Sequence, residues 1–550
     1  MRNLSTDEIE KIESTLTPLK SKISLKAIAV YGSQVSGYAR KESDYDVILV
    51  VNRFTQRIKY YYLRGEVQCS ALVVQERSFA NDCEKSSLGE FVSGRLLNPY
   101  EALLGRDYLS DNETTFKQRV MIEGLSEAYA ENGRFAEDIE FPLNYFLFEK
   151  LRKRAAIYPP VVYSYALTYG DDLRESNLET SMAGFRRAAV KLQTAGLVDY
   201  DSNNAIVKLR PEKMKGGLAV RLSSTASYTT RGIRQYAVHG YAGRVGLDVV
   251  GREVASKLER AKEHSELPDV ITTPKSLWSL KHGRLFAASS DWLTDLLDYF
   301  GMKKVSTIVT KKPLGEIYNS TSFYTLIDNS GGRSLSFAVK RYSDIKGIKW
   351  GLLYVWSLKN TNFTTNAGER MHREFRAIGQ FKDLGLFTPD VLAVFLSEKI
   401  LVTRYIKGKD LSSIQSAYLQ GESEDLSTQR EFGAILARVH RAGSCIGDTK
   451  PSNAIVAESD SNIYLTDLEQ VHSNGNLAWD LAEFIYYSVR FTLKEDRARK
   501  LVNEFISGYL EGGGDSNVIE QTSALRYRAP FQAFIAPNVL NALRKDLASI

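Results

Sequence analysis

The C-terminal half of the chain alternates short apolar runs with a segment of helical hydrophobic spacing. Residues 335–340, Leu-Ser-Phe-Ala-Val-Lys, predict a strand that ends in a lysine, and residues 369–381 predict a helix after it. Residues 454–456 and 463–465 are apolar runs that predict two short strands joined by a polar turn. This mixture of strands and helices predicts an α+β arrangement.

The N-terminal half begins with a strand pattern and continues with a helical one. Residues 27–31 and 47–51 are apolar runs that predict two strands separated by a polar interval. Residues 119–158 predict a helical layer, and a helix over 161–169 follows Pro159-Pro160 and ends before Gly170.

A second helix and a hairpin follow. The helix has an apolar face and a basic face, formed by Met182, Phe185, Ala189 and Leu192 and by Arg186, Arg187 and Lys191. Two strands around a turn at 201–204 complete an order that resembles a winged helix-turn-helix of about 50 residues. In that geometry the basic face contacts DNA or RNA. Winged helices also dock proteins, and charged faces are usually just solvated, so both alternatives stay open.

Length and composition limit the class of protein. A chain of 550 residues exceeds the size of one hydrophobic core, so several domains are expected. No apolar run approaches the roughly 18 residues of a membrane helix, and residues 1–20 lack the apolar centre of a signal peptide. We therefore expect no membrane span and a cytoplasmic location. The net charge of +6 permits contacts with nucleic acid without requiring them.

Residues 447–453, Gly-Asp-Thr-Lys-Pro-Ser-Asn, and a later aspartate carry the side chains that phosphoryl transfer requires. Asp448 would accept the proton of the substrate hydroxyl, and Lys450 lies in the same loop and is a further catalytic candidate. Asn453 and Asp467 would bind the metal ions. Lys340, at the end of its strand, would hold the nucleotide phosphates.

These motifs resemble the protein-kinase-like superfamily, and within it the small atypical kinases: the RIO type and the kinase subunit of the KEOPS tRNA-modification complex. The resemblance covers roughly the last 250 residues, a domain-sized unit. It implies ATP and Mg²⁺, or Mn²⁺, as cofactors. It implies that Glu374 pairs with Lys340, with Glu369 as the less well centred choice, and that Asp480 anchors the catalytic loop. Residues 401–408 resemble the strand and hinge beside the adenine.

Three positions depart from the kinase pattern. Ile446 stands where a histidine usually precedes Gly-Asp, and the triplet 467–469 is Asp-Leu-Glu instead of Asp-Phe-Gly. The glycine-rich loop is reduced to Pro-Leu-Gly-Glu at 313–316, where Gly315 is the candidate for nucleotide contact. Asp-x-Glu endings also resemble sugar, choline and antibiotic kinases, so the acceptor can be a small molecule. An inactive kinase fold is the remaining alternative.

Residues 27–51 resemble the DNA polymerase β-like nucleotidyltransferases. Gly32 and Ser33 form the turn at which backbone amides approach nucleotide phosphates, and Asp44 and Asp46 lie one residue apart to bind two divalent ions. Active members of this superfamily carry a third carboxylate on a later strand, where this chain has Ser70. Glu66 is a candidate substitute. A site with two carboxylates binds metal less tightly and lacks the usual activating base, so a fold that serves nucleotide sensing or contacts between domains is the alternative to an active enzyme.

Together these features predict an α+β multidomain protein. We expect a nucleotidyltransferase-like mixed sheet over 1–118, a helical region with the winged helix over 119–215, and a helical connector over 216–300. That connector includes a linker at 268–274 and helices over 277–300. A two-lobed protein-kinase-like domain over 301–550 completes the chain.

The predicted activity is phosphoryl transfer from ATP to a hydroxyl group, by preference on a protein substrate or on the chain itself. One alternative is a nucleotidyltransferase that acts on protein or RNA and is regulated by the kinase-like domain. Another is a nucleic-acid-binding regulator whose catalytic domains only sense nucleotides.

Overall fold

The computed structural model describes residues 2–157, 161–170, 172–210, 277–287, 289, 291–302, 307–313, 321–328, 333–344 and 366–550, and in addition Arg231, Arg234, Gln235, Ala237, Val238 and Ala242. The chain divides into two compact units, Met1–Lys275 and Ser276–Ile550. Each unit contains both sheets and helices, so the α+β multidomain class predicted from the sequence is confirmed.

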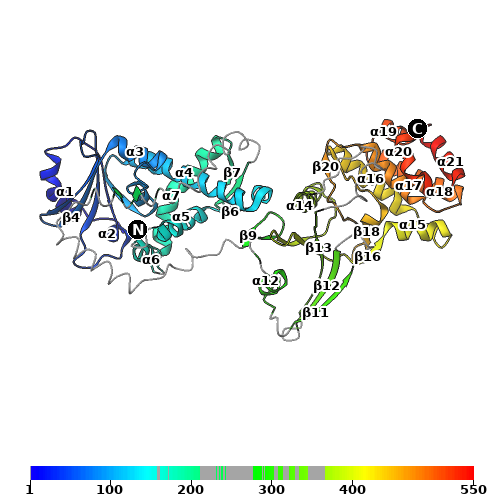
Figure 1. Cartoon of the computed structure of the whole chain (residues 1–550), viewed down its shortest axis with the longest axis horizontal. Coiled ribbons are helices and arrows are strands. Elements are labelled where there is room, and N and C mark those ends of the chain that lie inside the picture. Colours follow the sequence, from blue (N-terminus) through cyan, green and yellow to red (C-terminus); the bar gives the residue numbers. More distant parts are fainter. Residues whose placement is uncertain are drawn as a thin grey trace. The chain divides into compact units, whose positions relative to one another are not determined.

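The N-terminal unit is built on a five-stranded sheet with the order β3-β4-β2-β1-β5 (Figure 1, dark blue). Strand β2 runs parallel to β4 and antiparallel to β1. The predicted apolar runs form β1 and β2, whose central residues are fully buried because both faces of the sheet are covered. The strands are β1 (Leu25–Tyr31), β2 (Tyr45–Val51), β3 (Ile58–Arg64), β4 (Gln68–Gln75) and β5 (Tyr100–Leu104).

Helices pack against this sheet and continue beyond it. The first helix begins with a capping box between Ser5 and Glu8 and buries Ile12 and Leu16 against the strands. The helices and short 3-10 turns are α1 (Thr6–Lys20), α2 (Ser33–Ser36), α3 (Glu76–Lys85), η1 (Ser93–Leu97), α4 (Arg106–Asn132), η2 (Gly133–Glu137), α5 (Leu143–Ile157), α6 (Val162–Thr168) and α7 (Arg174–Thr194). Helix α4 runs without a break through residues 118 and 119, where the sequence suggested a domain boundary.

The predicted hairpin follows α7 as β7 (Val198–Asp201) and β8 (Ile206–Leu209), and β6 (Phe141–Pro142) completes a sheet of order β6-β8-β7. The predicted apolar face of α7 is buried. On its basic face, Arg187 donates to the buried Glu113 over 2.6 Å, and Arg186 donates to both oxygens of Glu179. These ion pairs engage two of the side chains considered for nucleic acid, and contact with DNA or RNA stays a prediction.

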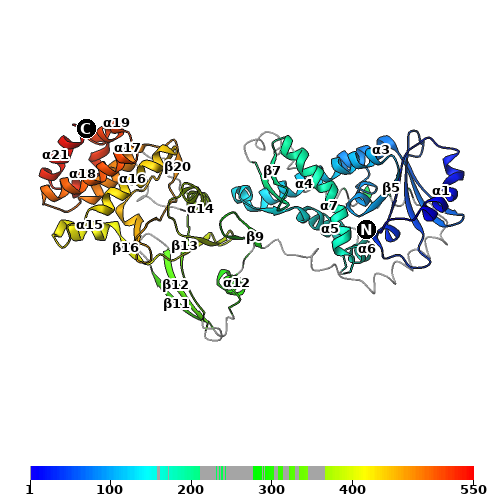
Figure 2. The same cartoon turned by 180° about the vertical axis from the view of Figure 1, so that it is seen from behind.

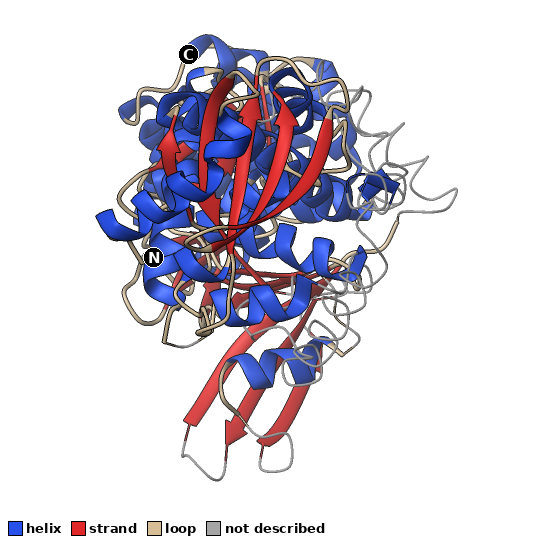
Figure 3. Cartoon of the chain, turned by 90° about the vertical axis from the view of Figure 1, so that its left-hand side faces the viewer, coloured by secondary structure: helices blue, strands red, loops and turns tan. Residues whose placement is uncertain are grey.

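The C-terminal unit contains a seven-stranded sheet of order β11-β12-β13-β15-β14-β10-β9, whose strands β11 to β13 are drawn in green (Figures 1 and 2). Figure 3 shows the strands of both units in red. The strands are β9 (Leu277–Ser279), β10 (Arg284–Phe286), β11 (Thr307–Pro313), β12 (Thr321–Asp328), β13 (Arg333–Arg341), β14 (Val391–Phe395) and β15 (Ile400–Arg404).

The prediction of helices over 277–300 was wrong for most of that segment. Only α12 (Trp292–Tyr299) is helical, whereas β9 and β10 are strands at the edge of the sheet. Strand β10 pairs in parallel with β14, and the ring of Phe286 stacks on that of Phe395 at 4.5 Å. The aromatic spacing suited a helix, but pairing with a strand more than a hundred residues away decided the structure.

The remaining elements form the helical part of this unit, which carries the catalytic-loop motif. They are α14 (Ala367–Asp383), β16 (Gly408–Asp410), α15 (Leu411–Gln420), α16 (Ser427–Arg441), β17 (Ser444–Cys445), η5 (Pro451–Asn453), β18 (Ala454–Ala457), β19 (Ile463–Leu465), β20 (His472–Ser473), α17 (Leu477–Ser488), α18 (Glu495–Glu511), α19 (Ser516–Gln521), α20 (Leu525–Arg528), η6 (Ala529–Phe534) and α21 (Pro537–Leu547). Among the described helices, none is both long and apolar enough to cross a bilayer, and the cytoplasmic location stays a prediction.

Candidate functional site

Strand β13 and helix α14 bring a lysine and a glutamate together in the C-terminal unit. Lys340 Nζ lies 2.7 Å from Glu374 Oε2, so the better centred of the two predicted partners makes the contact. Glu369 instead pairs with Arg373 on the same helix at 2.9 Å. The ammonium group of Lys340 also donates to Asp467, from the segment after β19.

Three carboxylates surround this lysine. Oxygen atoms of Glu374, Asp467 and Glu469 all lie within 4.8 Å of one another, and Lys340 Nζ is 3.0 Å from Glu469 Oε2. Oxygen ligands at this spacing suit Mg²⁺ or Mn²⁺, so the side chains present fit a divalent ion. Glu469, the third residue of the Asp-Leu-Glu triplet, was not among the site residues predicted from the sequence. Its negative charge, two residues after the predicted metal ligand Asp467, could have indicated it.

The electrostatics keep the lysine charged. Burial lowers the pKa of Lys340, but the adjacent charges of Asp467 and Glu374 outweigh it and hold that pKa well above its ordinary value. The pKa of Glu374 is raised, chiefly by burial, while Lys340 acts in the opposite direction. The positive charge of Lys340 therefore offsets the repulsion among the carboxylates of Glu374, Asp467 and Glu469.

Arg370 and Tyr342 hold the acids in place. Arg370 donates from Nη2 to both oxygens of Glu469, at 2.7 and 2.8 Å. The hydroxyl of Tyr342 donates to Glu374. Asp467 has a φ of +56°, a backbone conformation that residues other than glycine rarely adopt and that is often found at functional sites.

The catalytic-loop candidates lie between β17 and β18. Lys450 Nζ is 2.7 Å from Asp448 Oδ1, and the side-chain amide of Asn453 donates to the backbone carbonyl of Asp448 at 3.0 Å. The backbone carbonyl of Asn453 accepts from the amide of Thr466, next to Asp467, at 2.9 Å. The loop and the segment that carries Asp467 are thus joined by backbone hydrogen bonds.

Asp480, on α17, holds this loop through hydrogen bonds to its backbone. Its carboxylate is fully buried and accepts the backbone N–H groups of Ile446 and Gly447 at 2.6 and 2.9 Å. The side chain of Ile446 is buried where kinases usually have a histidine. A polar contact to Asp480 comes instead from His440, whose Nε2 lies 3.3 Å from Asp480 Oδ2.

Glu483, one turn after Asp480, is a buried acid that the sequence analysis missed. It accepts the backbone N–H of Thr449 at 2.8 Å. Burial and the charge of Asp448 raise its pKa well above the ordinary value, although Lys450 opposes the shift. Its place on a largely apolar helix gave no signal in the sequence. Gly315, the candidate of the reduced glycine-rich loop, lies outside the described residues.

A cavity of about 470 Å³ in the N-terminal unit brings together Gly32, Ser33, Asp44 and Asp46. Gly32 ends β1 with a φ of +82°, and a Cβ atom there would lie 2.5 Å from Asp46 Oδ2. Only glycine therefore allows the turn to lie so close to the acid. Asp46 is aligned with Tyr31 on β1 and with Ser70 on β4, so its position follows from the register of three strands.

The third carboxylate of active nucleotidyltransferases has no direct substitute at the position of Ser70. The hydroxyl of Ser70 donates to Asp44 Oδ2. Glu66, the suggested substitute, accepts from Ser14 Oγ at 2.9 Å and does not line the cavity, so that suggestion was wrong. Glu42, in the loop before Asp44, does line the cavity.

Known proteins are similar to this chain in the nucleotidyltransferase-like part and in the kinase-like part. A family model described as "Nucleotidyltransferase domain" matches residues 12–93. The N-terminal part of the chain is therefore similar to a nucleotidyltransferase domain.

Two similar proteins support a kinase-like region. A probable serine/threonine-protein kinase BUD32 homolog from Archaeoglobus fulgidus is 29% identical over 162 residues, which are 30% of this chain and 76% of that protein. KEOPS complex subunit Bud32 from Pyrococcus abyssi is 32% identical over 99 residues, 18% of this chain and 43% of that protein. The match therefore spans less than half of the Pyrococcus protein. These relatives support an enzyme of the transferase class, while the winged helix and the RIO type stay predictions.

Proposed function

We propose that the C-terminal unit transfers the γ-phosphoryl group of ATP to a hydroxyl group, with Mg²⁺ or Mn²⁺. The preferred acceptor is a Ser or Thr of a protein, including this chain. The observation that carries the proposal is the contact of Lys340 with Glu374 and Asp467. A lysine held between a helix glutamate and a metal-binding aspartate is the arrangement that positions nucleotide phosphates in kinases. The kinase-like domain is proposed to cover residues 301–550.

The roles of the other side chains follow from their contacts. Asp448 orients the acceptor hydroxyl and takes its proton, and Lys450, 2.7 Å away, offsets the negative charge that develops there. Asn453, Asp467 and Glu469 would supply oxygen ligands for metal ions, and such ions would neutralise charge on the transferred group. Asp480 keeps the loop in position through its two backbone amides.

The test is phosphate incorporation by the full-length protein. Wild type with radiolabelled ATP and Mg²⁺ should label itself or an added protein, Asp448→Ala should abolish transfer while the fold is retained, and Lys340→Ala should lose most of it. Asp460→Ala, which changes an exposed aspartate in the turn between β18 and β19, is the matched control. Transfer by Asp448→Ala at the wild-type rate would exclude the assignment.

A second activity is proposed for the N-terminal unit: nucleotidyl transfer to a protein or to RNA. The supporting observation is the approach of Gly32 to Asp46 within a cavity that also contains Ser33 and Asp44. Mass spectrometry after incubation with each nucleoside triphosphate distinguishes the two reactions, because a nucleotidyl adduct is heavier than a phosphate. Loss of nucleotidyl adducts in Asp44→Ala and Asp46→Ala, with phosphate adducts retained, supports it. Adducts that persist in both variants contradict it.

Protein partners are also expected. The Pyrococcus relative is, by its name, a subunit of the KEOPS complex, so association with other protein subunits is proposed for this chain too. Size-exclusion chromatography of the protein from its native source should then show a mass above that of one chain. Elution at the mass of a single chain would contradict this expectation.

A further inference from the structure

Three arginines line the N-terminal cavity that contains Asp44 and Asp46, and two of them, Arg95 and Arg154, lie outside residues 12–93, which match the nucleotidyltransferase model. Arg95 lies in η1, and Arg154 lies near the end of α5. The question is what their charges serve, because cations at the wall of a cavity are costly unless an anion balances them.

Arg95 is held by aromatic side chains instead of an acid. It donates to the hydroxyls of Tyr31 and Tyr60 at 2.9 and 2.6 Å, and its guanidinium lies 4.5 Å from the centre of the Phe91 ring. In the part of the chain that the structure describes, no carboxylate lies within ion-pair distance of it. Phenol groups and a ring orient the guanidinium, and the negative charge of Asp46 in the same cavity acts on it from beyond ion-pair distance.

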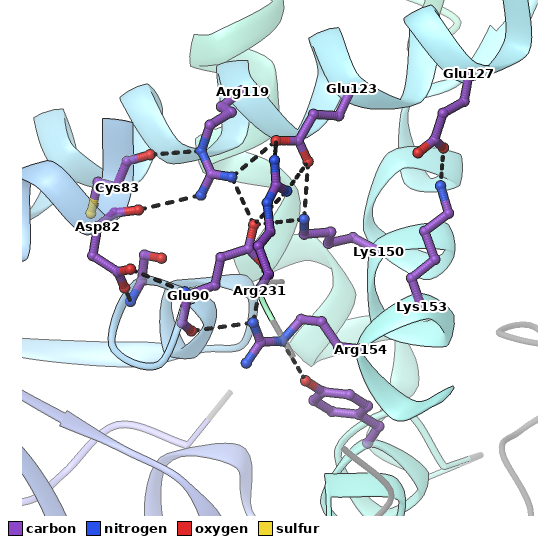
Figure 4. Close-up of polar contacts among 12 residues, drawn as sticks. Asp82, Cys83, Glu90, Arg119, Glu123, Glu127, Lys150, Lys153, Arg154 and Arg231 are labelled. Atoms are coloured by element: carbon purple, nitrogen blue, oxygen red, sulfur yellow. Dashed lines mark hydrogen bonds and ion pairs between the residues drawn. The ribbon is translucent and has the colours of Figure 1, made fainter. Parts of the chain in front are cut away.

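Arg154 belongs to a buried network in which cations outnumber acids (Figure 4). Arg119, Lys150, Arg154 and Arg231 all contact Glu90, and three of them also contact Glu123. The carboxylate of nearby Asp82 accepts four backbone N–H groups and keeps its negative charge, which acts on Arg119. Among the described residues of this network, four cations therefore face three carboxylates.

The two arginines are close enough to influence each other. The pKa of Arg154 is raised overall: burial lowers it, Tyr165 and Glu90 raise it, and the positive charge of Arg95 lowers it again. Gly94, next to Arg95 in the sequence, lies against Arg154, because a Cβ atom there would be 2.3 Å from the Arg154 guanidinium. A larger residue at position 94 would push that group away from the cavity wall.

We propose that Arg95 and Arg154 form a subsite for the phosphoryl groups of a ligand in the N-terminal cavity. Guanidinium groups bind phosphate oxygens in a bidentate manner, and a chain of phosphates joins a metal ion at the aspartates to a cation opposite them. The cavity holds both halves of that arrangement, with Asp44 and Asp46 for the metal and the guanidinium groups of Arg95 and Arg154 for the anion. The subsite serves the nucleotidyl transfer proposed above, but binding itself does not require transfer.

The experiment measures the binding of inorganic tripolyphosphate with Mg²⁺ by calorimetry. It uses the full-length protein carrying Lys340→Ala, so that the proposed phosphate-binding lysine of the other unit is absent. Arg95→Gln should weaken binding tenfold or more, whereas Arg95→Lys, which keeps the charge, should retain most of it. Arg64→Gln makes the same charge change at an exposed residue that lines the same cavity and should alter binding less than twofold.

Arg154→Lys provides a second variant, because it keeps a positive charge beside Glu90 but removes the bidentate group; it should also weaken binding. Tripolyphosphate affinity that is unchanged in Arg95→Gln, or equally reduced in Arg64→Gln, overturns the subsite. If Arg95→Gln fails to fold, unchanged affinity in Arg154→Lys overturns it equally.

A further arm identifies the source of the phosphates. An ATP analogue with a methylene group between the α- and β-phosphates should displace tripolyphosphate if the nucleotide supplies them. If both bind together, the subsite belongs to a phosphorylated acceptor. Arg95-dependent binding without any nucleotidyl adduct would support the subsite and contradict the transfer activity. Nucleotidyl transfer that is unchanged in Arg95→Gln would support the transfer activity and contradict the subsite.

Discussion

The buried carboxylate of Asp480 allows the sharpest test of how the C-terminal unit positions its catalytic loop. It accepts the amides of Ile446 and Gly447, which directly precede Asp448, and both amides are buried with it. In Asp480→Ala both donors lose their acceptor. Each buried donor left without a partner costs about 1–3 kcal/mol. We therefore expect the variant to lose about 2–6 kcal/mol of stability.

Asp480→Asn should be intermediate, since its single carbonyl oxygen replaces only one of two acceptors. The matched control is Asp410→Ala, which removes a half-buried aspartate from the N-cap of α15, where it accepts the Ser413 amide at 2.9 Å. Loss of such a cap costs about 1 kcal/mol and removes no acceptor from the amides of Ile446 and Gly447.

The assay combines urea denaturation with hydrogen exchange of the loop peptide. Exchange reports the loop separately, which matters because a chain of two units need not unfold in one step. Asp480→Ala should speed exchange at residues 446 and 447 and lower phosphoryl transfer by about a hundredfold, since a misplacement of about 1 Å has that effect. Stability and exchange equal to those of Asp410→Ala would refute the anchoring role.

Three further predictions concern buried charge and the glycine turn. The folded-state pKa of Glu483 lies above its ordinary value of 4.5, so its contribution to stability is fully present below pH 4.5 and is lost as the pH rises toward the folded-state pKa. In urea denaturation, Glu483→Gln should therefore be more stable than wild type at neutral pH, and this gain should shrink toward pH 4.5. Glu520→Gln, a surface substitution, should show no such gain. Gly32→Ala should abolish nucleotidyl adducts in mass spectrometry, because its Cβ would collide with Asp46, while phosphate adducts persist; nucleotidyl transfer at the wild-type level would contradict the close approach. In the same denaturation assay, Glu90→Gln should lower the free energy of unfolding by about 3–5 kcal/mol, because it leaves four cations with one fewer acid. A decrease below about 1 kcal/mol, the typical effect of a surface substitution, would show that the network does not stabilise the fold.

The sequence by itself determined the local elements and the candidate motifs. Hydrophobic runs predicted β1, β2 and β13, and helical spacing predicted α14, because these patterns depend only on neighbours along the chain. The loop at 447–453 and its anchor Asp480 were also identified there, since a motif concentrates its chemistry in a few consecutive residues.

Only the tertiary structure decided which side chains meet. Lys340 and Asp467 are 127 residues apart, and their contact depends on sheet and loop packing that no local pattern encodes. The same holds for the strand at 284–286, which pairs with β14, for Glu66, which lies away from the cavity, and for Arg95, whose partners are tyrosines from two strands. Local periodicity specifies an element and its buried face, whereas long-range pairing selects the neighbours that give each charge its role.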